Sequence, residues 1–222
     1  MKLYHPSFEH AISLTEDKVN VIIIENEMLF YTIISELKRQ VNKVEGSFIL
    51  SKNNAPINLD NYIEVITDII SFELSDKRFL PLITKQIESV CMNEENYLRT
   101  GELISLLENY FLDIVDESDC MAEPVYDIDV SSLIKSANFR LEHSFENLTE
   151  KIYEYVRLSA KYLGKRVFVF VNLKQFLSQE QLCELYKFFR YEKYHLVLME
   201  GCIKYSLPNE ERHIIDKDMC VI

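Results

Sequence analysis

A chain of 222 residues with 48% apolar and 27% charged side chains has the composition of a globular protein, which excludes disordered, collagen-like and low-complexity classes. Its five cysteines are odd in number and lack CxxC spacing, and no apolar run reaches the length of a membrane span, so we expect a reduced, cytoplasmic protein without membrane contact. The formal net charge of −12 by itself argues against a nucleic-acid binder, because such domains usually carry a basic surface.

The first seventy residues predict the opening of an α/β sheet. The continuously apolar run Val19–Ile24 is typical of a strand that is buried on both faces. Asn26 can cap a helix after this strand, Gly46 ends that helix, and its apolar face consists of Phe30, Ile33, Ile34, Leu37 and Val41. A second strand is predicted at Ser47–Leu50, and a second helical stretch follows from Pro56 and Asp60 through Ile70.

The middle of the chain predicts helices without strands between them. Helical periodicity marks Arg78–Cys91, Leu98–Val115 and Phe145–Leu163. In the last of these, acidic residues come first and Arg157, Lys161 and Lys165 come last. This order leaves two interpretations open, namely complementation of the helix dipole and contact of the basic end with DNA.

The acidic side chains are concentrated in one segment. Residues 101–130 contain nine Asp and Glu and no Lys or Arg, whereas the other 192 residues hold 24 basic and 27 acidic side chains, so a basic patch elsewhere is possible. Because a helix C-terminus carries partial negative charge, these carboxylates favour a hard cation such as calcium. Counted from Asp116, the loop has Met121 where an EF-hand requires Gly, and a solvated acidic loop remains the alternative.

The last third returns to the α/β pattern. Strands are predicted at Arg166–Val171, at His195–Met199 and near Met219–Ile222, with a helix at Gln179–Arg190. We therefore predict an α/β head made of residues 1–70 and 160–222, whose two segments share one sheet, and an inserted helical leg at 71–159.

The usual catalytic motifs are missing from this sequence. The four glycines (46, 101, 164 and 201) do not have the spacing of a P-loop, and the strand ending at Val171 is followed by Asn172, where a magnesium-binding carboxylate would stand. GxSxG and HExxH are absent, and Cys183 and His195 lie in apolar elements typical of a core. We therefore expect no enzymatic activity.

Segments along nearly the whole chain resemble the small adaptation protein of type II-A CRISPR systems. In chain order they are VITDIISFELSDKRFLPLITKQIES from Val65, the acidic segment followed by VSSLIKSANFRLE, KRVFVFVNLKQFLSQEQLCELYKFF from Lys165, HLVLMEG and RHIIDKDMCVI. The resemblance implies a P-loop-NTPase-like head without Walker motifs, plus an extended α-helical leg. It also implies a ring-shaped homotetramer with a basic hole that takes up calcium and binds the ends of linear double-stranded DNA without sequence preference. Its implied partners in spacer acquisition are the CRISPR integrase complex and the effector nuclease.

Carried over to this sequence, the resemblance implies two sets of site residues. The calcium ligands would come from Asp113, Asp116, Glu117, Asp119, Glu123 and Asp127. The DNA contacts would come from Lys135 and Lys151, which match lysine positions of the family. Lys52 and Arg140 are further candidates, chosen only for their neighbourhood in the sequence.

Two other functions remain in competition at this point. An acidic scaffold would recruit a basic protein partner through the 101–130 segment and would have no DNA affinity. A degenerate nucleotide-binding regulator would need a phosphate cradle, which the sequence does not offer.

Overall fold

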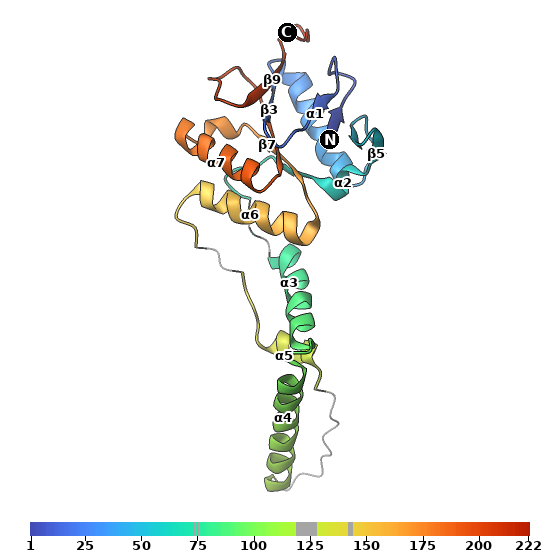
Figure 1. Cartoon of the computed structure of the whole chain (residues 1–222), viewed down its shortest axis with the longest axis vertical. Coiled ribbons are helices and arrows are strands. Elements are labelled where there is room, and N and C mark those ends of the chain that lie inside the picture. Colours follow the sequence, from blue (N-terminus) through green and yellow to red (C-terminus); the bar gives the residue numbers. More distant parts are fainter. Residues whose placement is uncertain (73, 75, 119–127, 142–143) are drawn as a thin grey trace. The chain divides into compact units, whose positions relative to one another are not determined.

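The computed structural model describes residues 1–72, 74, 76–118, 128–141 and 144–222 (Figure 1). The chain divides into two compact units. Residues 1–73 and 144–222 form the first, which we call the α/β unit, and residues 74–143 form the second, which we call the helical unit.

A five-stranded parallel sheet is the framework of the α/β unit. Its strands, in spatial order, are β6 (Ile63–Ile66), β7 (Val167–Val171), β8 (His195–Glu200), β3 (Val19–Ile24) and β9 (Glu210–Ile215). Every residue of β3 and β7 is buried, as their continuous apolar runs require for strands covered on both faces. Both chain segments contribute to this one sheet, and the predicted α/β class is confirmed.

A four-stranded antiparallel sheet accompanies the parallel one. Its order is β2 (Ile12–Ser13), β1 (Lys2–Tyr4), β4 (Ile49–Lys52) and β5 (Ala55–Ile57). The predicted strand at Ser47–Leu50 thus corresponds to β4 and lies in this second sheet. Asn53 and Asn54 both have positive φ and join β4 to β5, as a tight hairpin turn requires.

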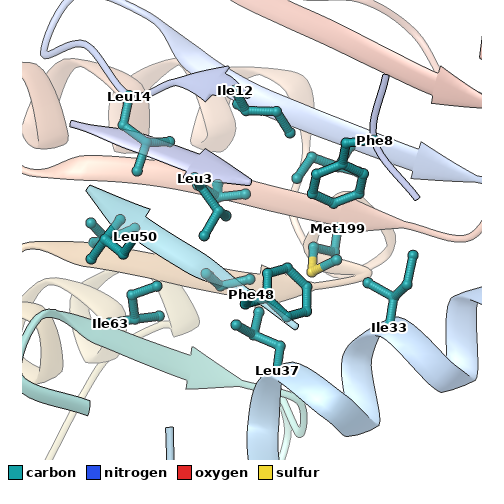
Figure 2. Packing of buried hydrophobic residues seen from close by; sticks show 14 of the residues in the cluster. Leu3, Phe8, Ile12, Leu14, Ile33, Leu37, Phe48, Leu50, Ile63 and Met199 are labelled. Atoms are coloured by element: carbon teal, nitrogen blue, oxygen red, sulfur yellow. The ribbon is translucent and has the colours of Figure 1, made fainter. Parts of the chain in front are cut away.

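The main core lies between the two sheets and helix α1 (Glu27–Val41). Figure 2 shows Leu3, Leu14 and Leu50 of the antiparallel-sheet region facing the same cluster as Ile33 and Leu37 of α1 and Met199 of β8. Asn26 caps α1, because its side chain accepts a hydrogen bond from the N–H of Leu29 at 3.0 Å.

Helices α6 (Leu148–Leu163) and α7 (Gln179–Tyr191) cover the opposite face of the parallel sheet. The Phe168 ring of β7 meets the Phe189 ring of α7 edge to face, at a centroid distance of 5.7 Å. α6 ends at Gly164, whose φ of 71° is a left-handed conformation that other residues adopt at a cost.

The unit boundary differs from the predicted head and leg. We predicted that the leg extends to residue 159, yet α6 belongs to the α/β unit. Its apolar stripe explains this, because Ile152, Val156 and Ala160 are buried in that unit.

Two local predictions are wrong. Residues 60–70 do not form a helix: only α2 (Leu59–Tyr62) is helical, and the chain then enters β6, where Ile63 pairs with Val167. Pairing with the buried strand β7 overrides the local pattern. The last strand is β9 and not Met219–Ile222, since Val221 forms only an isolated bridge with Ile215.

The helical unit contains α3 (Asp76–Cys91), α4 (Tyr97–Glu117) and α5 (Val130–Ser136). The positions of α3 and α4 agree with the predicted helices at 78–91 and 98–115. α3 packs against α5, and Phe79 and Ile134 are buried side chains of these two helices. By contrast, α4 has no buried residue over its 21 positions.

We expect Tyr155→Phe to destabilise the α/β unit by about 1–3 kcal/mol, because it removes a donor from a buried carboxylate. The Tyr155 hydroxyl donates to Glu64 Oε1 at 2.6 Å, and Glu64 Oε2 lies 3.9 Å from Lys165 Nζ. Urea unfolding would measure the change. Tyr153→Phe on the same helix is the matched control and should change stability by less than about 0.5 kcal/mol. Equal effects of the two substitutions would contradict the assigned role of this hydrogen bond.

Candidate nucleic-acid interface

The carboxyl edge of the parallel sheet, where doubly wound folds hold their ligands, has no phosphate cradle after β3. β3 ends at Ile24 and α1 begins at Glu27, so only Glu25 and Asn26 connect them. A backbone cradle needs a longer glycine-rich loop. The N-terminus of α1 is instead capped by Asn26 and lies next to the carboxylates of Glu25 and Glu27, which oppose an anion.

Lys174, which follows β7 at this edge, is held inside the protein. Its side chain is 2% exposed, and Nζ lies 2.6 Å from Glu210 Oε1, to which the Tyr186 hydroxyl also donates at 2.7 Å. The backbone N–H of Lys174 donates to Glu200 Oε1 at 3.0 Å. This lysine is therefore a partner of buried carboxylates and is not positioned for a phosphate.

The same network leaves two carboxylate oxygens without a partner. Glu200 Oε2 and Glu210 Oε2 are buried and make no hydrogen bond. Burial raises the pKa of the Glu200 carboxyl group, and the hydrogen bond from the Lys174 backbone opposes this increase. A protonated Glu200 would relieve the repulsion from Glu210 that also contributes to the higher pKa.

The four residues predicted to contact DNA are divided between the two units. Lys52 is exposed at the end of β4, and Lys151 is half-buried in α6 with its Nζ 4.6 Å from the centre of the Phe72 ring. Lys135, in the last turn of α5, and Arg140 are exposed and belong to the helical unit. Lys151 is thus partly engaged by Phe72, whereas the other three side chains are open to solvent.

Three of the predicted calcium ligands lie at the end of α4. Asp113, Asp116 and Glu117 are exposed there, and no basic residue stands in the last turn of this helix. The other three, Asp119, Glu123 and Asp127, lie outside the described residues. Among the residues that the structure describes, no group of three or more His, Cys, Asp or Glu side chains could hold a metal ion, so calcium binding stays a prediction.

Asp129 has a structural role at the end of the acidic segment. Its side chain caps α5 by accepting the N–H of Ser132 at 2.5 Å, and this hydrogen bonding lowers the pKa of the Asp129 carboxyl group.

The basic end of α6 is mostly engaged by protein groups. Arg157 lies 3.1 Å from Glu154 and 3.6 Å from Glu192, and Lys165 Nζ donates to the carbonyl of Ile63 at 2.9 Å. Of the three basic residues, Lys161 is exposed and Lys165 is buried. These contacts favour the structural interpretation for Arg157 and Lys165.

A basic cleft in the α/β unit was missed by the sequence reasoning. It has a volume of about 990 Å³, and its lining includes Lys52, Tyr62, Gly164, Arg166, Lys193 and His195. Arg166 stands directly before β7 and Lys193 two residues before β8. The signal in the sequence was a basic residue shortly before each of these two buried strands. Because the amino ends of parallel strands meet at one edge of the sheet, the two basic residues come together there.

Comparison with known proteins identifies the family. The model of the family described as CRISPR-associated protein (Cas_Csn2) matches residues 40–219. The CRISPR-associated protein Csn2 of Streptococcus agalactiae is 24% identical over 164 residues, which is 71% of this chain and 70% of that protein. The chain belongs to the Csn2 family of CRISPR-associated proteins.

A solved structure shares the fold of this chain. The crystal structure of Stu0660 of Streptococcus thermophilus matches with a TM-score of 0.56 and 14% identity, over 97% of this chain and 74% of that one. At this identity the match supports the shared fold alone. The resemblance to the type II-A adaptation protein is thereby confirmed at the level of the family. Among the described residues, no helix is long and apolar enough to cross a membrane.

We expect Glu200→Gln to remove part of the pH dependence of stability. Because the folded pKa of Glu200 lies above its ordinary value of 4.5, the folded protein binds this proton more strongly than the unfolded chain. The free energy of unfolding therefore falls as pH rises from that ordinary value through the raised folded value. Thermal unfolding between pH 4 and 8, on the order of the range in which this carboxyl titrates, would measure a shallower slope in the variant.

The matched control for this experiment is Glu211→Gln, which neutralises a half-exposed carboxylate on the edge strand β9. The control should keep the wild-type slope. If Glu200→Gln had the wild-type slope as well, the raised pKa that burial gives the Glu200 carboxyl group would be refuted.

Proposed function

We propose that this protein binds the ends of linear double-stranded DNA, without sequence preference and without catalytic turnover, as a calcium-stabilised homotetrameric ring. It would act in CRISPR spacer acquisition beside the integrase complex and the effector nuclease. Membership in the Csn2 family is the observation that carries this proposal. The ring, the calcium and the binding of DNA ends are proposed from the resemblance of the segments quoted above to the type II-A adaptation protein.

The carboxyl edge of the sheet supports a role without turnover. In a nucleotide hydrolase this edge would present a phosphate cradle and a free lysine. Here a two-residue connection replaces the cradle, and Lys174 is paired with Glu210. These features leave nucleotide chemistry without support at this edge.

Helix α4 supports self-association. Leu98, Leu106 and Tyr110 are 75%, 66% and 57% exposed, and no residue of this 21-residue helix is buried. Most of the stability of a protein helix comes from packing of its apolar face, so a helix like this one needs a partner. Further copies of the same chain provide such a partner in a homotetramer.

The negative charge at the end of α4 is the reason why calcium is part of the proposal. Asp113, Asp116 and Glu117 lie where α4 carries partial negative charge, without a basic residue in the last turn. In a tetramer each of these carboxylates would occur four times. A bound divalent cation would reduce the repulsion that opposes both assembly and the approach of DNA.

Contacts to phosphate explain why binding would ignore sequence. Phosphate oxygens are the same at every base pair, so the exposed side chains of Lys52, Lys135 and Arg140 would fix position and not sequence. A closed ring repeats each contact around the duplex and adds their fields together. The affinity should therefore be sensitive to salt.

We expect linear duplex DNA to be bound and a covalently closed circle of the same length to be ignored, because a ring can be threaded only at an end. A gel-shift series in calcium would measure both affinities. Equal binding to both forms would refute the threading of ends. An absence of binding to either form at physiological salt would favour the acidic scaffold in its place.

We expect the triple substitution Asp113→Asn, Asp116→Asn and Glu117→Gln to weaken the calcium response of the assembly. Light scattering with and without calcium would measure it. The wild type should approach four times its 26.3 kDa mass in calcium, and the variant should remain smaller at the same calcium concentration.

The matched control changes three other exposed carboxylates of the helical unit, Glu94, Glu95 and Glu102, to Gln. This control removes the same charge away from the end of α4 and should assemble like the wild type. If both triple variants behaved alike, the acidic end of α4 would have no specific part in calcium binding.

A further inference from the structure

The basic cleft, defined above by Lys52, Tyr62, Gly164, Arg166, Lys193 and His195, lies at the amino edge of the parallel sheet. Its basic residues and His195 lie at strand ends or in the connections that lead into strands. Arg166 precedes β7, Lys193 and the first residue of β8, His195, enter from the α7–β8 connection, and Lys52 ends β4. All of them belong to the α/β unit, so the cleft lies within one compact unit of the chain.

The sign of the charge in this cleft is opposite to that of the whole chain. Lys52, Arg166 and Lys193 line it, and Glu16 is the one carboxylate among the described residues of the lining, in a protein with a net charge of −12. Among the described residues, none of these three cations has an ion pair. Lys18 and Lys43, outside the cleft, do lie near carboxylates, at 3.0 Å from Glu211 and 3.8 Å from Asp60.

Helix ends reduce this positive charge without cancelling it. α6 and α7 both end near the cleft, and a helix C-terminus acts as roughly half a negative charge. Cations at that place partly complement the helix dipoles, which is the structural explanation for them. Three cations against one carboxylate and two half-charges still leave an excess of about one positive charge.

Arg166 is held in a defined position. Its backbone N–H donates to the carbonyl of Tyr62, and its own carbonyl accepts the N–H of His195, both at 2.9 Å. Its guanidinium lies 5.6 Å from the centre of the Tyr194 ring, and Nη1 donates to the carbonyl of Lys165 at 3.4 Å. The remaining N–H donors of this planar group are available, and such a group suits bidentate contact with a phosphate.

His195 contributes no charge to the cleft at neutral pH. Its Nδ1–H donates to the carbonyl of Thr15 at 3.2 Å, and burial lowers the pKa of its imidazole. The attraction for an anion therefore comes from the two lysines and the arginine.

We propose that the basic cleft is a phosphate-binding site in which Arg166 and Lys193, assisted by Lys52, hold a phosphate group. Its volume of about 990 Å³ is much larger than a single phosphate ion and is suited to a phosphate within a longer molecule. The expected source is the backbone of a DNA duplex, and free phosphate is the other source of the same chemistry. The duplex source rests on the function proposed above, whereas phosphate binding itself does not.

The test uses the full-length double variant Arg166→Gln/Lys193→Gln. Its matched control is Lys187→Gln/Arg190→Gln, which removes one lysine and one arginine from exposed positions of α7 that do not line the cleft. Thermal unfolding would be followed in inorganic phosphate and in chloride at equal ionic strength, and affinity for a short linear duplex would be measured over a range of salt.

We expect phosphate to raise the Tm of the wild type and of the control and to leave the double variant unchanged. For the duplex, we expect about a tenfold loss of affinity in the double variant and a smaller slope of log K against log salt. Loss of the phosphate effect with unchanged duplex affinity would support the site and identify free phosphate as its source. Wild-type behaviour of the double variant in both assays would overturn the proposal.

Two further outcomes separate this inference from the function on which its duplex source rests. A wild type that responds to phosphate but does not bind duplex would support the cleft and refute DNA binding. If circular dichroism showed that Arg166→Gln/Lys193→Gln does not fold, Lys52→Gln/Lys193→Gln would replace it. This variant keeps the Arg166–Tyr194 contact, and an unchanged phosphate response in it would overturn the proposal.

Discussion

The burial of β3, β7 and β8 on both faces is the constraint on which the α/β unit depends. Strands this apolar cannot leave a face to water, so each face of the sheet must be covered. On one face α1 and the antiparallel sheet provide the cover, and on the other face α6 and α7 do (Figure 1). With both faces closed, polar chemistry is confined to the two edges where the strands begin and end.

The two edges of the parallel sheet differ in whether their charged side chains are paired. At the carboxyl edge, Glu200 ends β8 and accepts the backbone N–H of Lys174, while the side chain of this lysine pairs with Glu210, the first residue of β9. Lys174 is therefore not free at the place where doubly wound folds bind nucleotides. At the amino edge, Arg166 and Lys193 have no carboxylate partner among the described residues, and the cleft stays open and basic. The internal ion pair and the open cleft together favour a protein that contacts phosphates at its surface over one that hydrolyses a nucleotide.

An element could be predicted from the sequence where its own residues determine it, and could not where its pairing with other strands does. β3, β7 and α6 were predictable because their apolar patterns are long and encode their own burial. β6 was mistaken for part of a helix and β9 was missed, because both are sheet-edge strands that are defined by pairing with β7 and β3. The basic cleft was missed for the same reason: the strand order, which no local pattern records, brings Arg166 and Lys193 to one edge. Lys52 was selected by neighbourhood alone, and the structure places it in that cleft.

In the helical unit, the apolar pattern of helix α4 does not match the burial of its side chains. α4 has leucine and aromatic side chains at helical spacing, as a helix in a core would, yet none of its residues is buried. Its last turns carry Asp113, Asp116 and Glu117, which oppose the helix dipole and have no basic residue in the last turn to offset them. An unburied apolar face and uncompensated carboxylates on one helix are both unfavourable in a single chain. Assembly would bury the first and a bound cation would neutralise the second, so one oligomeric, calcium-bound state would account for both.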